Sequence, residues 1–356
     1  MKHGPYACAW VLIGFAAGLL AFVNPGLAQV NFQGKTVTLY AALGVGGGGD
    51  TMARTLIPYF QKNLPGEPTI VVRNMPGGGG IQGVQYLYNV APHDGTAFGL
   101  TPGGPIKEPL MGNSGKATYD LRKFHWIGSL GAEDSVCAVW HTSPIMSLQD
   151  ARTTEVRLAA TGTASNSAMV PLLINDLAGT RLRPISGYDG GTSLLAVERG
   201  EMDGRCMSIA SLRATRPNWL SEHLVRFLFV TSDSDDPDLK GVPTISAQLK
   251  NDADRQALKF FEMPDEIQDP FMLPPGVSVE TVAAFRKAFD ATVHNPAYLD
   301  DANRHKQSIV PHSGEQVQAT IQAMYDTPRD VVERVKRATS VDVTKANAKK
   351  RAGEKK

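Results

Sequence analysis

Short apolar runs alternate with helical patterns along the chain, and glycine loops separate them. The apolar run over 36–43 predicts a buried strand, and apolar residues at helical spacing over 51–64 predict the helix that follows. Asp50 is expected at the N-cap of this helix. The same pattern predicts strands over 68–72 and 96–100 and a helix over 81–90. Strand, loop and helix repeating in this order predict a parallel sheet with crossover helices.

A second set of elements follows the segment 101–123, which is rich in glycine and proline and is expected to be irregular. Strands are predicted over 136–140, 156–160, 183–185, 203–208 and 225–230, and helices over 167–177 and 192–199. After a polar linker over 232–237, helices are predicted over 278–293, 296–305 and 314–335, the first with Ser278 as its N-cap. The chain is thus an α/β protein, and its length suggests about two domains.

Four strand-to-helix junctions consist of small residues, and they lie at 44–50, 74–80, 161–166 and 187–191. Glycine lets the backbone approach a ligand because no Cβ intervenes. Ligands of open α/β sheets bind at the carboxyl ends of the strands, which is where these loops are predicted. Two loops from each half of the chain could therefore enclose one small ligand, and the helix N-termini beside them favour an anion.

The first loop also matches the dinucleotide fingerprint G-x-G-x-x-G through Gly44, Gly46 and Gly49. A dinucleotide site needs an acidic residue at the end of the second strand, where this sequence has Val72, Arg73 and Asn74. The lysine of a nucleotide-phosphate loop is missing from all four loops. The sequence therefore argues against a nucleotide, and we expect neither a cofactor nor a metal.

Charge and short motifs narrow the function further. The chain has 36 basic and 35 acidic residues, whereas nucleic-acid-binding proteins usually carry a basic excess, so no nucleic-acid partner is expected. Neither H-E-x-x-H nor G-x-S-x-G occurs. An exported hydrolase on an α/β scaffold is an alternative function, because residues distant in sequence can assemble a catalytic site.

The N-terminus has the features of a signal peptide. Lys2 and His3 precede an apolar run over 9–22 that is too short to span a bilayer comfortably. The small residues Gly26 and Ala28 predict cleavage after Ala28, so residues 1–28 are expected to be removed and the protein to be exported. The basic segment 345–356 is expected to belong to a disordered tail.

Cys137 and Cys206 are the cysteines of the predicted mature chain. Their spacing does not suit a metal site or a redox motif. An oxidising compartment would permit a disulfide between them. Two separate buried thiols are an equal alternative.

Several motifs together resemble the Bug family, the extracytoplasmic solute receptors of tripartite tricarboxylate transporters. The first is the glycine loop that ends at Asp50, with Arg54 in the following helix. The second is V-x-N-x-P-G-x-G-G over 72–80, and the third is Tyr-x-Gly-Gly over 188–191. Asp-Gly at 94–95, Gly-x-x-Asp over 200–203 and Val-Pro-Thr over 242–244 also occur in the family order. The match extends over most of the mature chain, from residue 35 to residue 338.

The resemblance implies a two-domain periplasmic-binding-protein (flytrap) fold with two hinge crossings. Domain 1 would comprise 29–127 and 232–338, domain 2 would comprise 128–231, and 339–356 would be the tail. The expected protein is a periplasmic monomer, not an enzyme, that captures a small carboxylate between its domains and delivers it to the membrane permease subunits of a tripartite transporter. A ligand-sensing receptor of a signalling system is a further alternative.

The family typically grips one carboxylate through backbone groups and small hydroxyls. The second-domain loop reads Ala-Ser-Asn at 164–166, where Gly-Ser is common in the family, and this departure leaves the identity of the ligand open. Carried over by position, the expected ligand-binding residues are Gly47, Gly48, Gly49, Asp50, Gly78, Gly79, Gly80, Thr163, Ser165, Asn166, Tyr188, Gly190 and Asp203.

Overall fold

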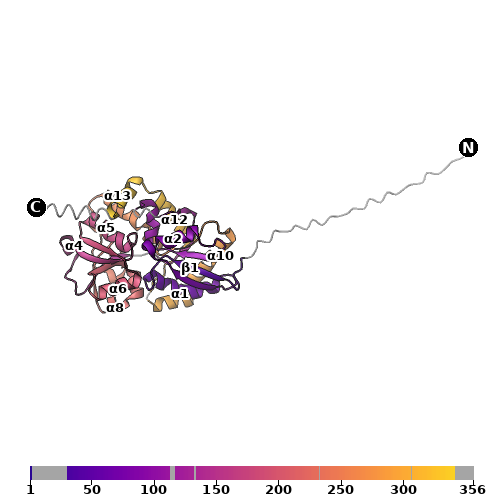
Figure 1. Ribbon diagram of the computed structural model, residues 1–356, viewed down its shortest axis with the longest axis horizontal. Helices are drawn as coiled ribbons and strands as arrows, with labels where there is room; N and C mark the ends of the chain where they lie inside the picture. Colours follow the sequence, from indigo (N-terminus) through magenta and orange to yellow (C-terminus); the bar gives the residue numbers. More distant parts are fainter. Residues whose placement is uncertain (2–29, 113–116, 132–133, 232, 306, 341–356) are drawn as a thin grey trace.

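The protein consists of two α/β bodies that lie side by side, each built on one sheet (Figure 1). The computed structural model describes Met1 and residues 30–112, 117–131, 134–231, 233–305 and 307–340. The predicted signal peptide (apart from Met1) and the tail beyond residue 340 lie outside these residues. Among the described residues, no helix has the length and apolar character needed to cross a membrane.

The first body contains a six-stranded sheet in the order β11-β4-β10-β3-β1-β2. Strand β1 is parallel to β2 and β3, as predicted, but β10 is antiparallel to both β3 and β4. The sheet is therefore mixed, because two of its strands come from a segment that returns to it after the second body. Its strands are β1 (Thr36–Ala41), β2 (Thr69–Asn74), β3 (Ala97–Leu100), β4 (His125–Ser129), β10 (Phe271–Leu273) and β11 (His312–Ser313).

The second body contains a five-stranded sheet in the order β7-β6-β8-β5-β9. Strand β6 is parallel to β7 and β8, whereas β5 is antiparallel to β8 and β9. The predicted strands over 156–160 and 225–230 are confirmed. The strands are β5 (Ser135–Trp140), β6 (Val156–Ala160), β7 (Leu182–Ser186), β8 (Gly204–Ser208) and β9 (Val225–Val230).

Helices cover both sheets, and several differ from the prediction. Asp50 is not an N-cap: α1 begins after Gly47, so Asp50 lies inside its first turn. The helix predicted over 314–335 is two helices, because Pro328 disfavours helical backbone at Thr327. The helices are α1 (Gly48–Asn63), α2 (Ile81–Asn89), α3 (Gly103–Met111), α4 (Leu148–Thr153), α5 (Asn166–Ala178), α6 (Gly190–Glu198), α7 (Ile209–Thr215), α8 (Pro217–Ser221), α9 (Asp252–Glu262), α10 (Val279–Val293), α11 (Pro296–Arg304), α12 (Gly314–Tyr325) and α13 (Arg329–Thr339).

Short 3₁₀ helices supplement these elements, and one of them forms the second glycine loop. They are η1 (Gly77–Gly80), η2 (Leu121–Lys123), η3 (Pro237–Leu239), η4 (Ser246–Gln248) and η5 (Met263–Ile267). The prediction that 101–123 is irregular is wrong for α3 and η2. Prolines are tolerated near the start of a helix, which is where Pro105 lies in α3.

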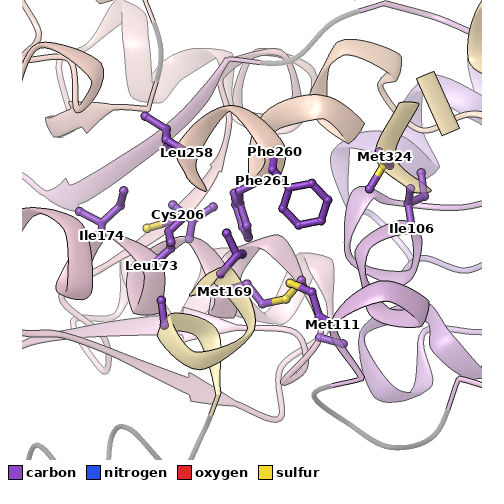
Figure 2. Packing of buried hydrophobic residues seen from close by; sticks show 14 of the residues in the cluster. Ile106, Met111, Met169, Leu173, Ile174, Cys206, Leu258, Phe260, Phe261 and Met324 are labelled. Atoms are coloured by element: carbon purple, nitrogen blue, oxygen red, sulfur yellow. The ribbon is translucent and has the colours of Figure 1, made fainter. Parts of the chain in front are cut away.

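One hydrophobic core is shared by the two bodies. It joins α3 of the first body and α5 of the second through α9, α12 and α13, with Phe260, Phe261 and Met169 fully buried in its middle (Figure 2). Helix α13, at the top of Figure 1, contacts α3, α5 and α9. The bodies are thus packed together along one side.

The chain passes from the first body to the second after β4 and returns after β9. The predicted domain boundary at 127/128 falls inside β4, which pairs within the first sheet. The exact domain limits otherwise stay a prediction.

Cys137 and Cys206 form a disulfide between β5 and β8, where they face each other in the strand register. The sequence left this bridge and two separate thiols as equal alternatives. The disulfide joins adjacent strands in the second sheet, next to the site described below.

Candidate functional site between the two bodies

A cavity of about 120 Å³ lies between the two bodies. Five helices begin at its wall, since the N-cap residues of α1, α3, α5, α6 and α7 all line it. Helix N-termini carry unsatisfied N–H groups and the positive end of the helix dipole. The cavity is therefore suited to a negatively charged ligand. The five N-cap residues are Gly47, Pro102, Ser165, Asp189 and Ser208.

Around the cavity, backbone atoms of the first body pack directly against backbone atoms of the second body. A Cβ built on Gly190 would lie 2.7 Å from Cα of Gly47, and one built on Gly79 would lie 2.8 Å from the backbone N of Ser165. Real Cβ atoms do not approach other atoms so closely. The glycines of the predicted loops thus allow the two bodies to close on each other.

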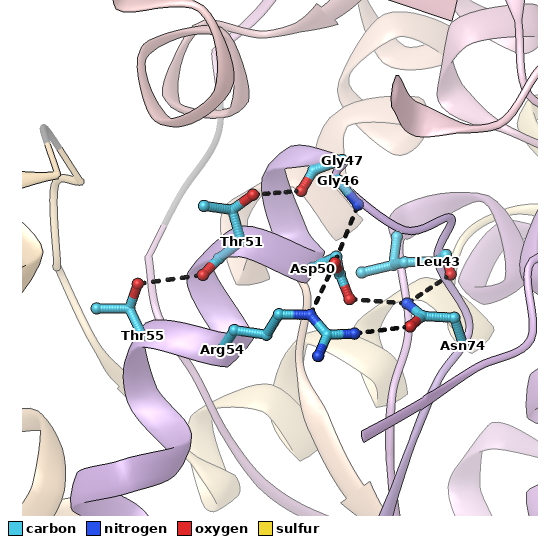
Figure 3. A network of polar contacts seen from close by, with 8 residues as sticks. All are labelled: Leu43, Gly46, Gly47, Asp50, Thr51, Arg54, Thr55 and Asn74. Carbon is cyan, nitrogen blue, oxygen red and sulfur yellow. Dashed lines mark hydrogen bonds and ion pairs between the residues drawn. The ribbon is translucent and has the colours of Figure 1, made fainter. Parts of the chain in front are cut away.

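Asp50 holds the first glycine loop in place (Figure 3). Its carboxylate accepts hydrogen bonds from Gly46 N at 3.0 Å, Asn74 Nδ2 at 2.7 Å and Arg54 Nε at 3.0 Å. Asn74 Nδ2 also donates to the carbonyl oxygen of Leu43 at 3.1 Å. Asp50 is 2% exposed, and it positions the loop instead of facing the cavity.

The pKa of Asp50 reports how strongly its carboxylate is held. Burial raises this pKa, but the hydrogen bonds from Arg54, Asn74 and Gly46 outweigh burial, and the net shift is downward. The carboxylate is therefore ionised at neutral pH and fully engaged in the loop.

Arg205 of β8 supplies a cation to the cavity wall. Its Nη1 donates to the carbonyl oxygen of Gly190 at 3.0 Å and to Oγ of Ser193, while its buried Nε has no hydrogen-bond partner among the described residues. Among the described residues, no carboxylate lies within ion-pair distance of the Arg205 guanidinium. Burial lowers the pKa of Arg205 to about 10, and the charge of Asp189 offsets part of that shift. Arg205 is thus protonated at neutral pH.

A network of charged and polar groups supports the cavity beside Gly103 and Asn166. Lys107 Nζ donates to Asn166 Oδ1 at 3.0 Å and lies 3.4 Å from Asp265 Oδ1, and Asn166 Nδ2 donates to the same carboxylate at 3.0 Å. Ser135 Oγ donates to the other oxygen of Asp265 at 3.0 Å. The network joins α3, α5, η5 and β5, so it fixes Asn166 at the point where the two bodies meet.

Asp269 is a second acidic residue of the first body that lines the cavity. Its Oδ2 lies 2.1 Å from the position that a Cβ of Gly49 would take, so glycine is needed at residue 49. Burial, and then the charge of Asp265, raise the pKa of Asp269 to about 7. Within the described residues, no hydrogen bond engages its carboxyl group.

The structure brings seven of the predicted ligand-binding residues together in the cavity wall: Gly47, Gly48, Gly49, Gly79, Ser165, Asn166 and Gly190. Gly78 and Gly80 lie beside them without lining the cavity, and their φ angles of 67° and 103° shape the second loop. Thr163 is exposed, and Tyr188 packs against the core of the second body. The ligand-binding role of each residue stays a prediction.

Asp203 lies away from the cavity. It precedes β8, whereas the cavity is at the other end of that strand, near Ser208. Its carboxylate accepts hydrogen bonds from the backbone N of Arg157 at 2.7 Å and from the Arg157 guanidinium. Asp203 therefore joins β6 to β8.

Arg205 and Asp269 were missed by the sequence analysis. A charged residue in the middle of a strand predicted over 203–208, followed directly by Cys206, was a signal that could have identified Arg205. Asp269 carries no comparable signal, because only the tertiary structure brings the segment after η5 next to Gly49.

Solved structures are similar to this chain, although no protein-family model and no curated protein sequence matches it. The periplasmic binding protein BugD is 20% identical with a TM-score of 0.70, over 85% of this chain and 97% of BugD. MatC from Rhodopseudomonas palustris, solved with bound malate, is 20% identical with a TM-score of 0.67, over 84% of this chain and 99% of MatC. Another R. palustris protein, solved with adipate, is 16% identical with a TM-score of 0.64, over 85% of this chain and 97% of that protein.

These similarities extend over nearly the full length of each solved chain, and each neighbour was solved as a binding protein or with a bound carboxylate. At this level of identity they establish the fold. The predicted flytrap fold is therefore confirmed: the chain has the two-domain fold of the Bug-type periplasmic solute-binding proteins.

Proposed function

We propose that the protein is a periplasmic receptor that captures a small carboxylate between its two bodies and delivers it to the permease subunits of a tripartite tricarboxylate-type transporter. The neighbours solved with malate and adipate support a carboxylate as the ligand class. The proposed receptor acts as a monomer, is exported through its signal peptide, and binds its ligand without converting it.

The observation that carries the proposal is Arg205. A guanidinium that is partly withdrawn from water costs free energy unless an anion compensates its charge. Among the described residues, the guanidinium of Arg205 donates hydrogen bonds only to neutral oxygen atoms. It also borders the cavity at which five helices begin. A ligand carboxylate would supply the missing negative charge and could accept a hydrogen bond from Nε.

The hydroxyl groups at the cavity favour binding over hydrolysis. Ser165 Oγ donates to the Gly162 carbonyl at 2.7 Å, and Ser208 Oγ accepts from Ser211 N at 3.1 Å. A serine nucleophile needs an adjacent base, and no histidine is among the described residues that line the cavity. These hydroxyls are engaged in the turns that begin α5 and α7.

The test is thermal unfolding of the mature chain against a panel of mono-, di- and tricarboxylates, with wild type and Arg205→Gln compared. A ligand that binds only the folded protein raises the melting temperature as its concentration exceeds Kd. Losing a charged hydrogen bond costs about 1.5–3 kcal/mol, so Kd should rise roughly tenfold to a hundredfold in Arg205→Gln. The ligand-free variant should be at least as stable as wild type, because the substitution removes a buried charge.

Arg183→Gln is the matched control, because Arg183 makes an exposed ion pair with Glu155 on the surface. It should bind like wild type. If no carboxylate stabilises the wild-type protein, or if the protein turns over an ester or an amide, the receptor proposal is wrong. Transport is tested separately, by whether a strain lacking the protein loses uptake of the identified ligand.

A further inference from the structure

The cavity contains two side-chain charges of opposite sign, one from each body. Arg205 belongs to β8 of the second body, and Asp269 belongs to the segment that precedes β10 of the first body. Closure of the two bodies brings both groups to the wall of the same small cavity.

Asp189 also lines the cavity, but its carboxylate is already engaged. Its Oδ1 accepts hydrogen bonds from Thr192 N at 2.7 Å and Thr192 Oγ1 at 2.8 Å, and its backbone N donates to Thr192 Oγ1 at 2.9 Å, which completes the capping box of α6. Asp269 differs, since the described chain supplies its carboxyl group with no donor. Of the two acids in the wall, Asp269 is the one whose carboxyl group has no hydrogen-bond donor among the described residues.

The backbone aims Asp269 in a specific direction. Its φ angle is +41°, a left-handed conformation that few residues other than glycine, asparagine and aspartate adopt. Its side chain fills the space beside Gly49 that any other residue there would occupy. The left-handed backbone of Asp269 and the absence of a side chain at Gly49 together place the Asp269 carboxyl group at the cavity wall.

We propose that the ligand is a small zwitterion, whose carboxylate pairs with Arg205 and whose protonated amine pairs with Asp269. This inference rests on the proposed receptor function and specifies the chemical class of its ligand. An ammonium group supplies the donors that Asp269 lacks, just as a carboxylate supplies the anion that Arg205 lacks. The two ends of the ligand would contact different bodies, so a bound zwitterion links the two bodies in the closed form.

The electrostatics of the cavity wall support this assignment. The pKa of Asp269 is raised to about 7 by burial and then by the nearby charge of Asp265. An ammonium beside Asp269 would favour its ionised form, whereas a second ligand carboxylate at the same place would be repelled unless a proton were bound.

The experiment compares matched acids that differ by one amino group, using calorimetric titration of the mature protein. Suitable pairs are aspartate with succinate, glutamate with glutarate, and 4-aminobutyrate with butyrate. At least one amino acid should bind about tenfold to a hundredfold more tightly than its deaminated partner, and N-acetylation should remove this advantage.

Asp269→Asn tests the assigned residue. Asparagine tolerates the left-handed backbone, so the variant should fold. It should reduce the preference for the amino acid over its deaminated partner about tenfold or more. Asp300→Asn, an exposed acid-to-amide change on α11, is the control and should keep the wild-type preference.

The outcomes separate the two proposals. If dicarboxylates or monocarboxylates bind while every amino acid binds more weakly, the zwitterion inference is overturned and the carboxylate receptor stands. An unchanged preference in Asp269→Asn overturns the role of Asp269. If no acid of any pair binds, both proposals fail together.

Discussion

At the scale of single residues, the glycines matter mainly for how closely the two bodies approach. A Cβ on Gly190 would lie only 2.7 Å from Cα of Gly47. Its neighbour Gly191 has only ordinary contacts, with a Cβ position 3.5 Å from the Val45 carbonyl oxygen. Both glycines lie in the first turn of α6 and face the first body, but only at Gly190 is there no room for a Cβ.

This contrast predicts different effects for two adjacent substitutions. Gly190→Ala should prevent full closure, and since overpacking costs about 1–3 kcal/mol, ligand Kd should rise roughly tenfold or more. Gly191→Ala should bind like wild type and be slightly more stable, because alanine favours helices over glycine. Titration and melting of the ligand-free variants measure both effects. Equal affinities in the two variants would show that the contact does not limit closure.

At the scale of elements, the position of α1 and of the loop before it depends on the carboxylate of Asp50, which does not line the cavity. Asp50 joins the loop, the helix and the end of β2 through Gly46, Arg54 and Asn74. The glycine loop has little side-chain packing of its own. Its conformation is therefore set mainly by these hydrogen bonds.

Asp50→Ala should destabilise the protein by about 2–4 kcal/mol, because three donors lose their acceptor and all three hydrogen bonds are partly buried. Ligand binding should weaken as well, since the loop lines the cavity. Denaturant unfolding measures the loss. Asp330→Ala is the control: Asp330 is also an acid in a first helical turn, of α13, but it is exposed. A loss of similar size in both variants would contradict the role assigned to Asp50.

Elements with strong local patterns could be predicted from the sequence, and those that depend on tertiary contacts could not. Strand β6 and strand β9 have apolar runs that a single arginine interrupts in each, and both strands were located correctly. Strand β10 has three residues and is stabilised by pairing with β3 and β4, from which it is distant in sequence. The glycine loops were visible as motifs, and Arg205 had a weak signal as a charged residue within a predicted strand, whereas the place of Asp269 at the cavity became visible only with the fold.

At the scale of the whole molecule, buried acids gather where the chain crosses between the bodies. Glu262, at the end of α9, lies near Asp265, Lys107 and Asp134. Burial is the main cause that raises the pKa of Glu262 to about 7, while a hydrogen bond with Thr231 lowers it in part. The folded protein therefore holds this carboxyl group largely protonated in mildly acidic solution.

The raised pKa of Glu262 gives stability a defined pH dependence. The unfolded chain releases this proton near pH 4.5, so the contribution of Glu262 to stability is largest below that pH. This contribution to the free energy of unfolding declines as pH rises from 4.5 to about 7 and is constant at higher pH. The total change is a few kcal/mol at most, because each pKa unit corresponds to about 1.4 kcal/mol.

Glu262→Gln should flatten the pH dependence between pH 5 and 7 and should be more stable than wild type at pH 8. Denaturant unfolding across this pH range measures both. Glu266→Gln, a change at an exposed residue one turn further along the chain, should keep the wild-type slope. If Glu262→Gln keeps that slope too, another group causes the dependence.

The core around Phe260 and Phe261 belongs to both bodies at once. Melting either body would expose apolar surface of the other, so the two lose their structure in one cooperative transition instead of two. The free energy released when a ligand binds between them is then added to the stability of the whole chain, including edge strands such as β2 and β7 that never contact it.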